Sequence, residues 1–167
     1  MTIETINKNT FLLLDADRAE SGRITYSLND YANAEINASG YFRLFTAGTG
    51  SWHTAANQKG KERTFSIIKI KPGNLISIVL EYRKKRYRFS RSTSWKLRFI
   101  LLNRDGEEIL SILPSINWEK ESHNYILQVN EEYEEECDPF LILQAVHCAN
   151  LSMSMLNGGK VPALISI

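Results

Sequence analysis

Cysteine is scarce in this chain of 167 residues, which contains only two. Cys137 and Cys148 cannot form a disulfide framework, and two thiols alone cannot complete a zinc site. Both lie in or beside one apolar segment, so we expect buried, free thiols. No internal repeat and no linker rich in proline or serine divides the chain, and its length suits a single domain over residues 1–167.

Motifs of the common enzyme classes are also absent. The sequence has no G-x-S-x-G elbow, no P-loop, no G-x-G-x-x-G fingerprint and no H-E-x-x-H pair. Its three histidines, His53, His123 and His147, lie far apart along the chain. The sequence therefore predicts a protein that is not an enzyme and has no cofactor and no metal. An enzyme that uses His53 or His123 in a pocket is the weaker alternative.

A targeting signal and a large net charge are missing as well. The N-terminus has no basic segment, and its apolar run, residues 11–14, is too short for a signal peptide, so we expect a cytoplasmic location. The net charge is +1, so an electrostatic function must come from local asymmetry. Residues 83–98 carry eight basic and no acidic residues, whereas residues 131–138 carry six acidic and no basic ones.

Short stretches of alternating apolar and polar residues, separated by turn formers, make up most of the chain and are typical of β-strands. They are residues 22–28, two runs on either side of Ser39-Gly40, a hairpin of 75–82 and 86–90, a hairpin around Asn103–Gly106, and residues 124–129. We expect about eight to ten strands in a barrel or sandwich. The polar stretch 51–65 is expected to be a loop with at most a helical turn.

Residues 138–156 have the features of a helix that is apolar on every side. Asp138 is a good N-cap, Pro139 fits the first turn, and no charge follows up to Leu156. Such a helix must be buried in protein or in lipid. Its polar residues would lack partners in hydrocarbon, which favours a core helix over a membrane span. We therefore predict a mainly β fold, an antiparallel closed or nearly closed barrel around a buried hydrophobic C-terminal helix.

Three polar residues of this helix, Gln144, His147 and Asn150, follow one another at steps of three and form a stripe. The stripe can anchor the helix to the barrel backbone or line a small cavity, and we favour anchoring. On this interpretation His147 is a hydrogen-bonded core residue.

The order of these elements resembles the tubby C-terminal-like superfamily, which includes LURP-one-related proteins and phospholipid scramblases. The resemblance covers about residues 10–165 and rests on the hairpin at Asp105-Gly106, the strand 124–129 and the apolar helix begun by Asp138. It implies a closed barrel of twelve strands around a hydrophobic helix. Tubby domains bind phosphoinositide headgroups through basic residues on the outer barrel surface. The chain lacks the Asp-rich segment and the cysteine cluster of scramblases, so lipid scrambling is not implied.

The basic hairpin is the strongest candidate for a binding site. On the strand 86–90, alternation places Arg86 and Arg88 outside and Tyr87 and Phe89 inside. Arginine and lysine at a hairpin tip can hold phosphate groups, and they also protect an edge strand from aggregation. The predicted ligand-binding residues are Arg83, Lys84, Lys85, Arg86, Arg88 and Arg91.

A non-enzymatic module that binds anionic lipid headgroups, peripheral at a membrane, is the predicted function. The alternative is a scaffold that binds an acidic protein partner. Nucleic acid is disfavoured, because alternation turns the aromatic side chains away from the cations and thus from bases. The acidic run 131–138 lacks the spaced ligands and the glycine of a calcium loop, so we expect a solvated linker that can also pair with the hairpin.

Overall fold

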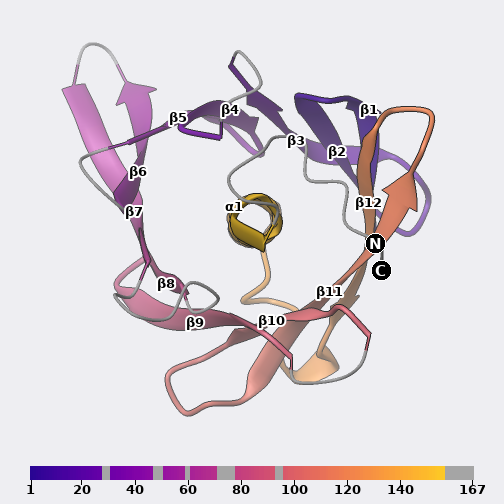
Figure 1. Cartoon of the computed structure of the whole chain (residues 1–167). Coiled ribbons are helices and arrows are strands. Elements are labelled where there is room, and N and C mark those ends of the chain that lie inside the picture. Colours follow the sequence, from indigo (N-terminus) through magenta and orange to yellow (C-terminus); the bar gives the residue numbers. More distant parts are fainter. Residues whose placement is uncertain (28–30, 47–50, 59–60, 71–77, 93–95, 157–167) are drawn as a thin grey trace.

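A computed structural model describes residues 1–27, 31–46, 51–58, 61–70, 78–92 and 96–156 (Figure 1). These residues form twelve strands, each antiparallel to the next, and β12 pairs with β1 to close a barrel. The strands are β1 (Thr2–Asn7), β2 (Thr10–Leu14), β3 (Glu20–Tyr26), β4 (Asn33–Asn37), β5 (Tyr41–Thr46), β6 (Ser51–Gln58), β7 (Lys61–Ile70), β8 (Ile78–Tyr82), β9 (Lys85–Arg91), β10 (Phe99–Leu102), β11 (Glu108–Asn117) and β12 (Ser122–Val129).

The helix α1 (Pro139–Leu156) runs through the middle of the ring of strands (Figure 1). It begins where the Asp138 carboxylate accepts a hydrogen bond from the Leu141 N–H at 2.8 Å, the expected N-cap. By length and composition α1 could cross a bilayer, but all of residues 140–154 are buried inside this fold. The prediction of a barrel around an apolar helix is confirmed. A short 3₁₀ helix, η1 (Glu131–Tyr133), precedes α1.

The predicted number of strands was too low, and the prediction of a loop over 51–65 is wrong. The described residues of this stretch, 51–58 and 61–65, lie in β6 and β7, which pair as an antiparallel hairpin. The inward positions of this hairpin include Thr54 and Ser66, whose buried hydroxyls donate to the Gln144 side chain of α1. A strand that faces a polar group of the helix lacks apolar alternation, so its sequence resembled a loop. The sequence also did not predict β1 and β2.

The polar stripe of α1 is hydrogen-bonded to side chains of the barrel. Tyr26 lies 3.0 Å from His147 Nδ1 and accepts from the Asn150 amide at 3.1 Å. Tyr125 donates to Asn150 Oδ1 at 2.5 Å. The predicted anchoring is confirmed, but the anchors are side chains of β3, β6, β7 and β12 and not the barrel backbone.

Both cysteines are buried and free, as predicted. Burial raises the pKa of the Cys137 thiol to about 12 and raises that of Cys148 as well. The two thiols therefore stay protonated at neutral pH and serve as small apolar side chains of the core.

Candidate functional site

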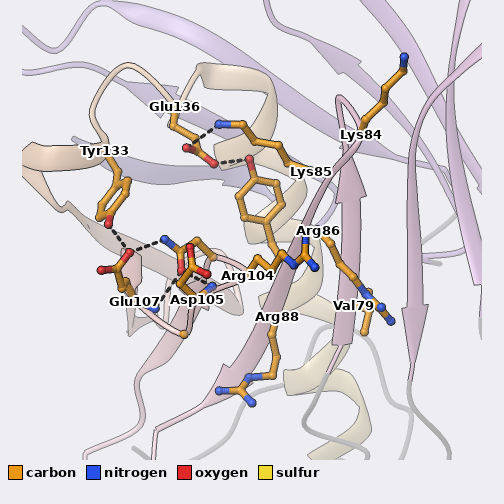
Figure 2. Close-up of a pocket in the computed structure, with 13 residues that line it drawn as sticks. Val79, Lys84, Lys85, Arg86, Arg88, Arg104, Asp105, Glu107, Tyr133 and Glu136 are labelled. Atoms are coloured by element: carbon orange, nitrogen blue, oxygen red, sulfur yellow. Dashed lines mark hydrogen bonds and ion pairs between the residues drawn. The ribbon is translucent and has the colours of Figure 1, made fainter.

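Three segments that are distant in sequence meet at one end of the barrel. Successive connections of an antiparallel barrel alternate between its two ends. The β8–β9 turn, the β10–β11 turn and the segment between β12 and α1 therefore share one end. Together they line a groove of about 1040 Å³ (Figure 2).

The basic hairpin forms the first wall of this groove. A two-residue turn, Arg83 and Lys84, joins β8 to β9. Tyr87 and Phe89 are 3% and 0% exposed, whereas Arg86 and Arg88 are exposed. The predicted alternation along β9 is confirmed. Residues 75–77, which were expected to open the first strand of this hairpin, lie outside the described residues.

The structure divides the six predicted ligand-binding residues into three groups. Four of them line the groove: Lys84, Lys85, Arg86 and Arg88. Arg83 lines a different pocket and makes an ion pair with Asp138 at 2.9 Å. Arg91 is the last residue of β9, at the opposite end of the barrel, and does not line the groove.

A fifth groove cation, Arg104, was not predicted from the sequence. It lies in the β10–β11 turn, which supplies the second wall. In the sequence, Arg104 lies among turn formers, and these predict only a hairpin turn. Successive turns of an antiparallel barrel lie at alternate ends. Arg104 can therefore be placed at the end of the basic hairpin once the number of strands between the two turns is known.

The acidic run supplies the third wall and pairs with part of the hairpin. Glu136 accepts from Lys85 Nζ at 2.8 Å and from the Tyr87 hydroxyl at 2.5 Å (Figure 2). Burial alone would raise the pKa of Glu136, but these two hydrogen bonds outweigh burial and hold that pKa below its usual value. Tyr133 donates to Glu107 and ties this wall to the β10–β11 turn. The expected pairing within the molecule is thus present at Lys85, and also at Arg83, which pairs with Asp138.

Four groove cations form no ion pair with any other described residue, and we call them the unpaired groove cations: Lys84, Arg86, Arg88 and Arg104. Figure 2 shows that Lys84 and Arg88 point in opposite directions from the hairpin. The positive charge is therefore spread along the groove and does not converge on one point. Such a distribution suits an extended anionic surface better than a single small ion.

The two residues of the β8–β9 turn, both cationic, have strained backbone conformations. Arg83 and Lys84 have φ values of 49° and 65°, in the left-handed region. A two-residue hairpin turn with both residues at positive φ is normally occupied by Asn-Gly, because glycine has no Cβ and asparagine tolerates the left-handed region better than most other residues. The chain has two long cationic side chains at positions where folding alone favours small residues.

We expect Lys84→Gly to stabilise the protein by about 0.5–1 kcal/mol, because glycine adopts positive φ without strain. Lys84 forms no ion pair with a described residue, so no salt bridge is lost. The midpoint of thermal unfolding should rise by about 2–4 °C for each kcal/mol added to the free energy of unfolding. The matched control is Lys84→Ala, which removes the charge but keeps the strain and should give no rise. An equal rise in both variants would assign the effect to charge and contradict the strain argument.

Side chains that bind metals do not cluster in the part of the chain that the structure describes. Among residues 1–27, 31–46, 51–58, 61–70, 78–92 and 96–156, no three histidine, cysteine or carboxylate side chains gather where they could hold a metal ion. Neither His53 nor His123 lines the groove. His123 is 3% exposed on β12, and burial lowers its pKa to about 4. The chemistry that the groove offers is hydrogen bonding and charge attraction to anions.

Comparisons with protein-family models, with curated proteins and with solved structures find no match to this chain. The function must therefore be inferred from the groove and from its charges.

Proposed function

We propose that this protein is a non-enzymatic module that docks on anionic membrane surfaces, with the unpaired groove cations facing the lipid headgroups. The observation that carries the proposal is their position. The β8–β9 hairpin and the β10–β11 turn bring them to one end of the barrel, and none of them forms an ion pair with a described residue. Each cation near an anionic membrane contributes about 1 kcal/mol of attraction. The net charge of +1 supplies no general attraction, so binding depends on presenting this end of the barrel.

The architecture supports the same proposal. A closed barrel around a central helix is what the resemblance to the tubby C-terminal-like superfamily implies, and we propose membership of that superfamily. Tubby domains bind phosphoinositide headgroups through basic residues on the outer barrel surface. Arg86 and Arg88 lie on the outer face of β9, since their neighbours Tyr87 and Phe89 point into the core.

An acidic protein partner is the second candidate. Asp105, Glu107 and Glu136 also line the groove, so its charge is mixed, as is common at protein interfaces. Nucleic acid has less support, because the hairpin's Tyr87 and Phe89 are buried and cannot stack on bases.

Sedimentation with vesicles tests the membrane proposal. We expect salt-sensitive binding to vesicles of phosphatidylserine and phosphatidylcholine, and no binding to phosphatidylcholine alone. Arg86→Gln with Arg88→Gln should weaken the binding about 30-fold, since two cations contribute about 2 kcal/mol. The matched control is Arg91→Gln with Lys120→Gln, which removes two exposed cations from the opposite barrel end and should leave the binding nearly unchanged.

Equal losses in the two double variants would show that no particular surface is presented to the membrane. Binding that is equal for both kinds of vesicle would overturn the proposal outright. A stoichiometric acidic protein that is retained by the native chain and lost in the Arg86/Arg88 variant would favour the second candidate.

A further inference from the structure

A second, smaller pocket opens beside the β8–β9 turn, at the same end of the barrel as the groove. Its volume is about 310 Å³, near the lower end of the range for small-molecule sites. The β4–β5 turn, β5, β7, the end of β8 and the start of α1 supply its walls. Its lining residues are Ala38, Ser39, Phe42, Phe65, Tyr82, Arg83, Asp138, Pro139 and Phe140.

Four of the nine residues that line this pocket are aromatic. The Phe42 ring lies 4.1 Å from the Phe140 ring and 5.1 Å from the Phe65 ring, centroid to centroid. Tyr82 and Phe140 are separated by 5.4 Å. Phe42 and Phe65 are only half-buried, although both pack against the core. An apolar ligand would therefore cover ring surface that water now contacts.

The charged rim of the pocket has unused hydrogen-bond donors and few free acceptors. Asp138 Oδ1 accepts from the Leu141 N–H, and Oδ2 accepts from the Tyr82 hydroxyl at 2.8 Å and from Arg83 Nη1 at 2.9 Å. A cationic ligand would have to compete for these occupied oxygens. Arg83 has five N–H donors, and its side chain is 68% exposed. Its guanidinium lies 5.0 Å from the centroid of the Tyr82 ring, which holds it at the pocket edge.

We propose that this pocket binds a small carboxylate with a compact apolar body, such as an aryl or short alkyl carboxylic acid. The carboxylate lies against the free donors of Arg83, and the apolar body packs on Phe42, Phe65 and Phe140. Ser39 lines the pocket and is exposed, so a charge introduced at this position would lie beside the bound ligand. This pocket is separate from the groove, because no residue lines both the pocket and the groove.

Ligand-observed NMR and calorimetry on the full chain test this proposal. We expect phenylpropionate to bind. Phenylpropylamine, which has the same ring and the opposite charge, should bind at least about tenfold more weakly, since a charge-assisted hydrogen bond is lost. Acetate, which has the charge without the apolar body, should not bind measurably. Equal binding of the acid and the amine would overturn the assignment of Arg83.

A matched pair of substitutions at Ser39 locates the site. Ser39 has a φ of 53°, a conformation that aspartate and asparagine tolerate better than other residues, so both variants should fold. We expect Ser39→Asp to weaken phenylpropionate binding about tenfold or more by charge repulsion, and Ser39→Asn to leave it within about twofold. Arg83→Gln, at an exposed side chain, should also weaken binding about tenfold.

The groove variant Arg86→Gln with Arg88→Gln separates this proposal from the membrane proposal. It should bind phenylpropionate like the native chain while losing its affinity for vesicles. If this variant loses phenylpropionate, or if Ser39→Asp and Ser39→Asn behave alike, the ligand is not in this pocket and the inference is wrong.

Discussion

Ala149→Arg is expected to unfold the protein. Ala149 lies in the middle of α1 and is 0% exposed, enclosed by the barrel. An arginine there both overfills the core and buries a charge without a partner. Together these effects should lower the free energy of unfolding by at least about 5 kcal/mol, which is comparable with the total stability of many domains. Ala145→Arg, at another fully buried position of the same helix, should have the same effect.

Circular dichroism in the near ultraviolet and urea titration measure this loss. The control is Leu156→Arg, at the last residue of α1, which is 39% exposed and should change the stability by less than about 1 kcal/mol. A soluble Ala149→Arg protein with a native urea midpoint would contradict the enclosure of α1 by the barrel. If α1 only attached the protein to a membrane, Ala149→Arg would leave the urea midpoint unchanged.

Acid is expected to destabilise the protein well above the pH at which carboxylates titrate. Burial lowers the pKa of His147 to about 3 and that of His123 to about 4. In the unfolded chain both have a pKa of about 6.5, so below that pH the unfolded state binds two protons that the folded state does not bind. The stability is therefore complete above about pH 6.5 and falls as the pH drops. Below about pH 6.5, protonation of each histidine in the unfolded chain lowers the free energy of unfolding by about 1.4 kcal/mol per pH unit. For the pair, the loss at pH 5 is about 4 kcal/mol.

Urea titrations between pH 7.5 and pH 5 test this expectation. His147→Gln keeps a side chain that can hydrogen-bond to the Tyr26 hydroxyl, and it should halve the slope of stability against pH, whatever it does to the stability at neutral pH. Adding His123→Gln should remove most of the remaining slope. An unchanged slope in the double variant would mean that the two imidazoles titrate normally in the folded protein.

Local rules explain which elements the sequence could predict. The start of α1 depends on Asp138 and Pro139, whose capping and φ preferences act within one helical turn. The burial of Tyr87 and Phe89 and the exposure of Arg86 follow from the period of two along a strand. Both features depend on neighbouring residues only, so a single sequence is sufficient to predict them.

Other features depend on what each segment meets in the folded chain. The hairpin of β6 and β7 has Thr54 and Ser66 at inward positions because Gln144, distant in the sequence, faces them across the core. Arg104 belongs to the groove because the closed barrel brings its turn to the end at which the basic hairpin lies. Neither arrangement leaves a periodic signal in the sequence. The number of strands and the closure of the barrel had to be known first.

The position of α1 has a consequence for synthesis on the ribosome. The central helix follows all twelve described strands in the chain, and β1 must wait for β12 before the barrel can close. Until α1 has emerged, the inward side chains of the nascent strands have no helix to pack on. Non-local pairing of this kind slows folding and leaves apolar surface open to aggregation. Chaperone dependence during translation, and loss of the fold in any chain that stops before α1, follow from a core helix that comes after the strands that enclose it.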